Sequence, residues 1–309
     1  MERLDRATWS ALARDHAQAA RDLTAAHRER RATGEKHAVE DFLFTYYPLR
    51  PAALERWSPG AGVALADAAG SAFEGARYFA MTPDGAAHLD TSAFLAQRGA
   101  AVRFHAELLR AVAGRAPRFD CFGLHEWAMV YREPAGGHRH DLPLRLGEAA
   151  TDEVVETHKI VCTHIDAYRF FTPPAEPLNA YRPTRETQVA MDQGGCLHVG
   201  MDLMKPVIHL GPAIPGALAL QAFVLARDIR ELDMRASPYD VSRFGLSPVA
   251  IETPEGKAAY VAAQRDLSRR AEPIRAALLA VCEDLLDTCS PGEDPRDERP
   301  AHLLAAARS

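Results

Sequence analysis

The amino-acid sequence predicts a mainly α-helical protein: a helical single domain with minor short strands. The chain has 309 residues and is 47% hydrophobic, which is enough to bury a sizeable core. Its long periodic windows carry apolar residues at helical spacing. The sequence shows no internal repeat and no alternation of strands and helices of the kind that builds a parallel sheet.

We divide the chain into three parts. Residues 1–34 are expected to form an N-terminal amphipathic helix packed on the domain, and residues 35–288 the helical catalytic domain. The composition of residues 289–309 is typical of a disordered tail.

The N-terminal helix is expected over residues 4–32. Trp9, Leu12 and Leu23 recur at helical spacing, and polar residues fill much of the rest. The end of this helix is basic and stops at Gly34. A solvated helix end explains the basic charge, and a phosphate-contacting patch is the functional alternative.

The stretch directly after this helix is dense in aromatic residues. Pro48 and Pro51 prevent a long helix there. Tyr46, Tyr47 and Arg50 each need a polar partner, so core packing explains them less well than it explains the phenylalanines beside them. We therefore expect these three side chains to line a pocket.

Residues 61–90 are rich in alanine and glycine and predict short strands or loops. Within them, residues 81–85 (MTPDG) predict a turn. Thr91 or Ser92 is expected to cap a helix that continues to about Ala113.

Three more helices and one long loop follow. A helix start is expected at residues 151–153, and a strong apolar stripe predicts a helix over residues 217–234. Residues 254–288 predict a last helix that is interrupted, or starts afresh, at Pro273. The proline-rich residues 172–188 predict a long extended loop that contacts substrate.

Ionisable groups gather in four otherwise apolar segments: residues 119–132, 159–171, 194–205 and 231–240. Burying such groups without partners is costly. Each segment therefore contributes either to a satisfied buried network or to the lining of a pocket.

The segment at 159–171 is the centre of the prediction. As a strand it would place His164, Asp166 and Tyr168 on one face, whereas as a helix it would put Asp166 beside Arg169. Either conformation brings an imidazole, a carboxylate and a phenol together.

The other three segments leave similar alternatives open. At least one of His125 and Glu126 is expected to be buried. A helix would stack His198, Asp202 and Lys205 on one face, which is either a site or an exposed face with an ordinary ion pair. The last segment offers either functional groups or a structural Asp–Arg pair with a helix cap. His138 and His140 lie in a predicted hydrophilic loop and are not favoured as ligands.

Composition narrows the class of protein. The net charge of −6 argues against a nonspecific coat for polyanions but permits one local basic patch. The five cysteines form no CxxC pair, which suits a reducing compartment. Neither a signal peptide nor a membrane span is indicated, so a soluble cytoplasmic protein is expected.

These groups suit two classes of chemistry. In one, a buried carboxylate stabilises the oxocarbenium character of glycosidic cleavage while aromatic side chains stack on a flipped base. In the other, a metal-dependent hydrolase or oxygenase acts on a small molecule in a helical bundle. The ligands in that second case would be His125, Glu126, His164, Asp166, His198 and Asp202.

Five blocks of the sequence resemble one bacterial family, found mostly in actinobacteria and commonly named 3-methyladenine DNA glycosylase. The blocks are GEKHAVEDFLFTYYPLRPAALERWSPG, CFGLHEWAMVYR, THIDAYRFFTPPA, GCLHVGMDLMK and RELDMRASPYD. The resemblance covers about Glu35 to about Leu286. It implies excision of a modified base from DNA: an alkylated base, or glucosylated hydroxymethylcytosine in phage DNA as an antiviral defence. The sequence carries no helix-hairpin-helix signature, to which residues 214–221 are the nearest approach.

We therefore expect a DNA glycosylase that needs no metal and no cofactor and has DNA as its partner. The expected catalytic groups are Asp166, Asp233, Asp240 and His164. The expected contacts to the base are Tyr46, Tyr47, His125, Glu126, His198, Asp202 and Tyr239. The expected contacts to DNA are Arg50, Arg169, Arg182, Arg185, Lys205 and Arg235. No lysine motif marks a Schiff-base nucleophile, so a monofunctional enzyme is expected. A non-enzymatic binding module is a third hypothesis, disfavoured by the many titratable groups.

Overall fold

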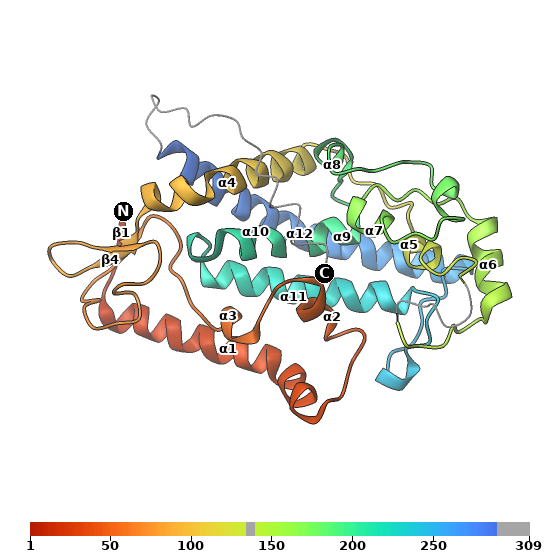
Figure 1. The fold of residues 1–309 in the computed structure, drawn as a ribbon, viewed down its shortest axis with the longest axis horizontal. Coiled ribbons are helices and arrows are strands. Elements are labelled where there is room, and N and C mark those ends of the chain that lie inside the picture. Colours follow the sequence, from red (N-terminus) through yellow and green to blue (C-terminus); the bar gives the residue numbers. More distant parts are fainter. Residues whose placement is uncertain (134–139, 289–309) are drawn as a thin grey trace.

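Long helices running roughly along the molecule form the body of the fold, and a small sheet closes one end (Figure 1). The computed structural model describes residues 1–133 and 140–288, so the predicted tail and His138 lie outside the described residues. The predicted class, mainly α and a single domain, is confirmed. The helices are α1 (Arg6–Thr33), α2 (Phe42–Tyr46), α3 (Pro51–Leu54), α4 (Thr91–Ala113), α5 (Leu124–Ala128), α6 (Glu148–Thr157), α7 (Ile165–Tyr168), α8 (Gln188–Met191), α9 (Leu197–Met201), α10 (Met204–Leu210), α11 (Gly216–Arg235) and α12 (Pro254–Asp287), with 3-10 turns at Glu176–Leu178, Gly211–Ala213 and Ser242–Phe244.

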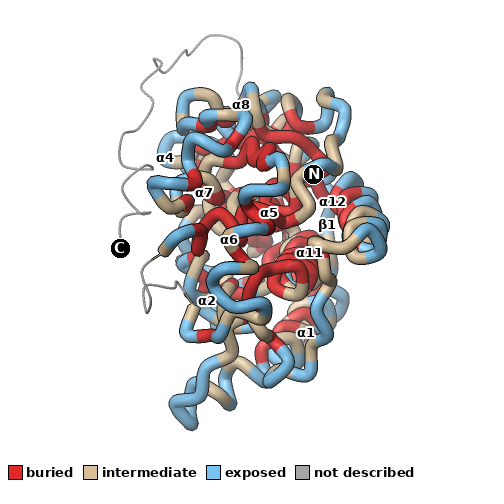
Figure 2. The backbone as a smooth tube through the Cα atoms, turned by 90° about the vertical axis from the view of Figure 1, so that its right-hand side faces the viewer, coloured by how far each residue is buried: buried red, intermediate tan, exposed pale blue. Residues whose placement is uncertain are grey.

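The core surrounds α11, which lies between α1 and α12. α12 packs along both α4 and α11, and α11 packs on α9 and α10. Phe223, Leu225 and Ile229 of α11 are buried, and Figure 2 shows this helix as mostly buried in the middle of the molecule. None of the described helices combines the length and apolar character that crossing a bilayer requires.

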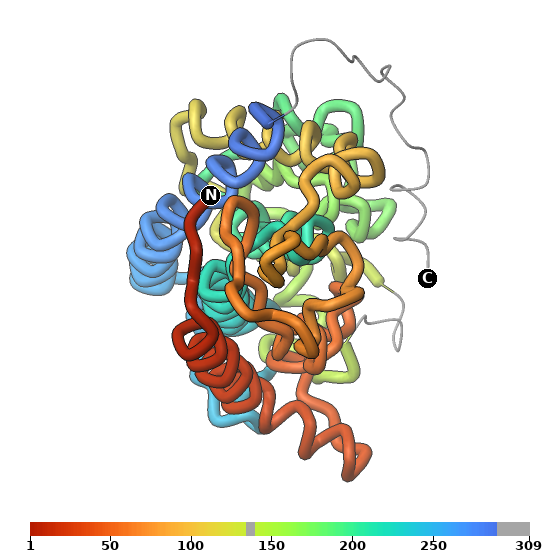
Figure 3. Tube along the Cα trace, turned by 90° about the vertical axis from the view of Figure 1, so that its left-hand side faces the viewer, coloured from red at the N-terminus to blue at the C-terminus, as the bar shows by residue number. Residues whose placement is uncertain are grey.

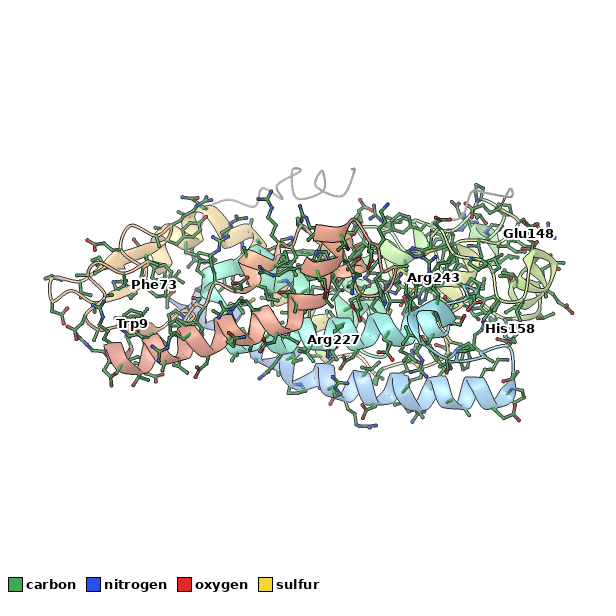
Figure 4. The ribbon with its side chains drawn as sticks, turned by 90° about the horizontal axis from the view of Figure 1, so that it is seen from below. Trp9, Phe73, Glu148, His158, Arg227 and Arg243 are labelled. Carbon is green, nitrogen blue, oxygen red and sulfur yellow. The ribbon has the colours of Figure 1, made fainter. Side chains whose placement is uncertain are left out.

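The sheet has four strands in the order β1 (Glu2–Leu4), β2 (Val63–Leu65), β4 (Ala87–Leu89) and β3 (Phe79–Met81). β1 is parallel to β2, and the other neighbours are antiparallel. The strands within residues 61–90 and the turn before β4 were predicted, whereas β1 was not, because three residues are too few to show a period. Figure 3 shows this N-terminal strand leading into α1 beside the sheet. Trp9 and Phe73 meet edge to face at 5.9 Å at this end of the molecule (Figure 4).

The long helices begin and end close to the predicted positions. Gly34 ends α1 with a φ of 78°. The cap of α4 differs from the prediction: Asp90, whose side chain accepts from the Ala93 amide, fills that position, and Thr91 is already helical. α12 continues through Pro273 without a break, so the predicted interruption is wrong. Packing of α12 on α4 and α11 outweighs the one hydrogen bond lost at the proline.

The segment at 159–171 is neither one strand nor one helix over its whole length. Its second half is helical in α7, where Arg169 lies beside Asp166 as the helical alternative predicted. Asn179 keeps the first half of this segment out of a helix. Its side chain accepts from the Cys162 amide at 2.8 Å and donates to the Cys162 carbonyl at 2.9 Å. The chain stays extended as far as His164, and α7 starts directly after it. The proline-rich loop that contains Asn179 holds a 3-10 turn and ordinary turns instead of one extended run.

The segment at 194–205 is also divided, into α9 and the start of α10. The helical hydrogen-bond pattern nevertheless continues across the junction: the Asp202 amide donates to the His198 carbonyl and the Lys205 amide to the Asp202 carbonyl. The approach to α9 requires glycine at position 195, because a Cβ there would lie 2.1 Å from the carbonyl oxygen of Arg118.

Candidate active site

A cavity of about 1530 Å³ opens among α2, α4, α7, α8, α9 and α10 and reaches the end of α1. The predicted site residues that line it are Tyr46, Tyr47, Asp166, Arg169, Arg185, Asp202 and Lys205. These residues come from two of the four polar segments (159–171 and 194–205), from the aromatic stretch after the first helix and from the proline-rich loop. The cavity is therefore where the predicted residues converge.

Asp202 is the central acceptor at the floor of the cavity. Its Oδ1 accepts from the Tyr47 hydroxyl at 2.9 Å, and its Oδ2 accepts from His164 Nε2 at 3.0 Å and from Lys205 Nζ at 2.6 Å. The Asp202 side chain is only 10% exposed. The alternative of an exposed helix face is thus excluded for this segment.

Asp166 sits beside Asp202 and shares Lys205 with it. Lys205 Nζ lies 2.6 Å from Asp166 Oδ2, so one ammonium bridges two carboxylates. Arg185 binds both oxygens of Asp166, and Arg169 Nε reaches Oδ1 at 3.2 Å. Three cations therefore surround this one carboxylate.

The two carboxylates stay ionised. Burial alone would raise the pKa of Asp166, but the charge of Lys205 and the Arg185 hydrogen bonds outweigh burial and hold that pKa at about 2. Burial likewise opposes ionisation of Asp202, yet Lys205 and His164 hold the pKa of Asp202 well below its ordinary value. The same carboxylates outweigh burial to raise the pKa of Lys205, which keeps its ammonium protonated.

His164 and Asp192 form a buried pair of groups behind the cavity floor. Burial raises the pKa of Asp192, whereas the pKa of His164 is raised because the charge of Asp192 and the Asp202 hydrogen bond outweigh burial. Gln188 donates to Asp192 Oδ2 at 3.1 Å. His164 Nδ1 and Asp192 Oδ1 have no hydrogen-bond partner among the described residues. Asp192 lines the cavity and was missed from the sequence, where it stands as a single acid in a polar stretch.

A second network lies deeper and does not line the cavity. His125 Nε2 donates to Asp233 Oδ1 at 2.8 Å, and Arg230 Nη1 lies 3.0 Å from both Glu126 and Asp233. The prediction that at least one of His125 and Glu126 is buried is confirmed for both. Arg230 was missed, although an arginine on the buried stripe of α11 is a signal that sequence inspection can detect.

The deep network and the cavity floor touch through imidazole rings. His198 meets His125 edge to face at 4.5 Å and stacks on His164 at 5.4 Å. Burial lowers the pKa of His198 well below its ordinary value, and both flanking histidines add to that effect. The pKa of His125 is raised because Asp233 outweighs burial. His198 is therefore the neutral ring between two rings whose charged forms are favoured.

Two groups of residues have the types and spacing of metal ligands, with ligand atoms within 4.8 Å of one another: His125, Glu126, His198 and Asp233, and His164, Asp166 and Asp202. In each group a cationic side chain already contacts both acids. Arg230 Nη1 lies 3.0 Å from an oxygen of each acid in the first group. Lys205 Nζ lies 2.6 Å from each aspartate of the second. A metal ion would have to displace that cation or bind against its repulsion.

The remaining predicted residues lie outside the cavity lining: Arg50, Arg182, Arg235, Tyr239 and Asp240. Asp240 caps the turn after it by accepting from the Ser242 amide at 2.9 Å. Arg235 pairs with Glu231 at 3.2 Å and not with Asp233, whose arginine partner is Arg230. In the sequence, residues 231–240 place Asp233, Arg235, Tyr239 and Asp240 close together. The structure does not bring these four side chains into one site.

The cavity wall contains other functional groups that sequence inspection did not select. The phenylalanines among these groups are Phe42, Phe104 and Phe170, and the cations among them are Arg31, Lys36, Arg103, Arg243 and Arg275. Phe42 stacks on Tyr46 with ring centroids 5.2 Å apart. The basic end of the first helix, noted in the sequence as a possible phosphate contact, contributes Arg31 to this wall.

The low pKa of Asp166 predicts acid sensitivity. A carboxyl whose pKa is lowered on folding contributes stability above its unfolded value of 3.8, and that contribution is lost as the pH falls through about 2. The difference corresponds to about 2 kcal/mol. We expect the free energy of unfolding, measured with urea at pH 6 and pH 2, to fall by about that much more in the wild type than in Asp166→Asn. An equal fall in both proteins would contradict the assignment.

Comparisons of the chain with protein-family models, with curated proteins and with solved structures find no match.

Proposed function

We propose that this protein is a DNA N-glycosylase that excises a modified base: an alkylated base, or glucosylated hydroxymethylcytosine in phage DNA as an antiviral defence. One observation carries the proposal. Fixed charges of both signs lie side by side at the floor of a large cavity, with Lys205 bridging Asp166 and Asp202 at 2.6 Å. The resemblance of five sequence blocks to the family commonly named 3-methyladenine DNA glycosylase supports the same reaction.

Breaking an N-glycosidic bond separates charge: the sugar develops positive charge and the departing base negative charge. Preorganised charges aimed at both fragments would lower the barrier. In this proposal Asp202 faces the sugar, because its Oδ1 has one hydrogen bond from the described residues, from Tyr47. Arg169, Arg185 and Lys205 face the leaving base. Asp166 holds these three cations in place.

The shape of the cavity supports a bulky, flipped base as substrate. Its volume of about 1530 Å³ exceeds the roughly 300–1,000 Å³ of typical small-molecule pockets, which leaves room for a base with a sugar substituent. The stacked pair Phe42 and Tyr46 offers an aromatic face to such a base. Arg31, Lys36, Arg103 and Arg243 on the wall would hold phosphates.

Lys205 is unsuited to covalent catalysis. Its ammonium lies between two carboxylates that raise its pKa against the effect of burial, whereas a Schiff-base lysine must lose its proton. The proposed enzyme is therefore monofunctional and leaves an abasic site. Its expected place of action is the cytoplasm, where the DNA lies.

The test is release of free base from defined DNA. The purified protein is incubated with duplexes and single strands carrying alkylated, deaminated or glucosylated hydroxymethyl bases, and the released base is identified by mass spectrometry. We expect release from one class, with strand breakage only after alkaline treatment. Strand breakage without alkali would contradict the monofunctional assignment. Absence of release from every substrate would contradict the proposal itself.

The alternative, a metal-dependent hydrolase or oxygenase, is favoured by the spacing of His125, Glu126, His198 and Asp233. The contacts of Arg230 with both acids of this group weigh against it. Metal analysis of the purified protein separates the two. Stoichiometric iron, manganese or zinc together with absence of base release would replace the glycosylase proposal with this one.

A further inference from the structure

Arg275 is a buried guanidinium without a partner at the wall of the cavity. It projects from α12, its residue is 4% exposed, and it lines the cavity. Its Nε and Nη2 have no hydrogen-bond partner among the described residues, and it forms no ion pair with any of them. The charge that acts on it is Glu272, an exposed residue on the same helix.

An uncompensated buried cation is expensive. Removing a guanidinium from water costs free energy that a paired carboxylate normally offsets, which is why buried arginines are almost always paired. Burial lowers the pKa of Arg275, in keeping with this unpaired state. Arg230 of α11, also buried, shows the usual solution, because two acids neutralise it.

The surroundings of Arg275 form a recess at the C-terminal end of α4. α12 packs along α4 and against α9, and α4 packs against α8. A Cβ on Gly194 would lie 3.7 Å from Arg275 Nη1 and 4.0 Å from Pro117, so the backbone of residue 194 borders the guanidinium. Gln264 and Ser268 of α12 hold this backbone through hydrogen bonds of 2.8 Å to the carbonyls of residues 195 and 194. The guanidinium thus lies beside a backbone segment that α12 holds in place.

A second buried side chain with an unpartnered atom, that of Asp192, lines the cavity close to Gly194 in the chain. Asp192, two residues before Gly194, is buried, and its Oδ1 has no partner. Burial raises the pKa of Asp192 above its ordinary value. Gln188 orients it through Oδ2. Two buried polar side chains with unpartnered atoms, Arg275 and Asp192, therefore line one cavity.

From this arrangement we infer that the recess at Arg275 binds an oxyanion of phosphate type. A guanidinium can bind two oxygens of one such group through a parallel pair of N–H groups, and the Nε and Nη2 of Arg275 have no partner among the described residues. The anion supplies the negative charge that the protein does not. Its source is either a free ion or a phosphate carried by a nucleotide. This inference goes beyond base excision and does not depend on it.

Binding is tested without DNA by thermal unfolding at constant ionic strength. The probes are inorganic phosphate, deoxycytidine 5′-monophosphate and unphosphorylated deoxycytidine. We expect the Tm of the wild type to rise saturably with a phosphate-bearing probe and not with deoxycytidine, because a ligand that binds only the folded state stabilises it. A response to inorganic phosphate identifies a free ion as sufficient. A response to the nucleotide alone identifies a substrate-borne phosphate.

Two variants on the same helix provide the control. Arg275→Met removes the guanidinium and keeps an apolar stem, so it is expected to lose the phosphate response while its Tm without ligand is unchanged or higher. Arg269→Met removes an arginine with a 65% exposed side chain and is expected to respond like the wild type. If Arg275→Met does not fold, Arg275→Lys, which keeps the charge without the two-pronged geometry, is expected to bind the same probe more weakly by calorimetry.

The inference is overturned if no phosphate-bearing probe raises the Tm of the wild type, since water alone would then solvate Arg275. It is also overturned if Arg275→Met keeps the full response, since the ion would then bind elsewhere. Neither result bears on base release, so failure here and failure of the proposed function are distinguishable.

Discussion

Asp202→Asn is expected to lower the rate of base release by about 10²–10³-fold, or about 2.7–4 kcal/mol of transition-state stabilisation, while the protein remains folded. The change removes one negative charge beside the developing sugar cation and little else. The asparagine oxygen can accept from Lys205 and His164, and its amide can donate to the Tyr47 hydroxyl, so the three hydrogen bonds to residue 202 persist. Single-turnover kinetics on the substrate identified by base release measure the effect.

Asp240→Asn is the matched control for this variant. The substitution is chemically identical, but Asp240 caps a turn outside the cavity lining. We expect its rate of base release to equal that of the wild type. A rate loss in Asp240→Asn as large as that in Asp202→Asn, or an unchanged rate in a folded Asp202→Asn, would contradict the placement of the active site at the cavity floor.

Arg230→Met is expected to have the largest effect on stability, a loss of about 3–5 kcal/mol in the free energy of unfolding. The residue is 1% exposed, and its guanidinium neutralises Glu126 and Asp233 at 3.0 Å and lies over the Phe42 ring at 3.8 Å. Methionine preserves the volume but leaves two buried acids without their arginine, and His125 contacts one of them, Asp233. Urea unfolding monitored by circular dichroism measures the loss.

Arg227→Met, one turn earlier on α11, is the control for Arg230→Met. The Arg227 side chain is 44% exposed and pairs with its neighbour Asp228 at 3.4 Å (Figure 4). Exposed pairs of this kind contribute little, so its free energy of unfolding is expected to change by no more than about 0.5 kcal/mol. Equal losses in the two variants would show that the buried network does not depend on Arg230.

The cavity floor and the deep network together explain why four apolar segments carry so many ionisable groups. His125, Asp233, Glu126 and Arg230 pair with one another, so these residues match the alternative of a buried network. Asp166, Asp202 and Lys205 also pair, but they line the cavity. Both alternatives that the sequence left open therefore occur in the one protein, in adjoining places.

Some of the residues predicted to contact DNA line the cavity, and others do not. Arg169, Arg185 and Lys205 line the cavity, whereas Arg50 and Arg182 are exposed away from its lining. A basic residue in a loop gives no local indication of the direction in which its side chain points. The sequence therefore indicated that arginines were available without indicating which of them meet.

The sequence by itself determined the helical class, the positions of α1 and α11, and the short strands before α4. These features depend on spacing within one segment: apolar residues every three to four positions, and glycine or proline at the ends. It also identified the four segments that carry the polar groups, because a charge within an apolar run is visible locally.

Only the tertiary structure decided which of those groups meet. His125 and Asp233 are 108 residues apart in the chain, and Tyr47 and Asp202 are 155 apart, so no local period relates them. The roles of Asp192, Arg230 and Arg275 depend on which neighbours packing brings to them or withholds. Pairing across helices is set by how the helices pack, and the free energy of a buried charge depends on that pairing.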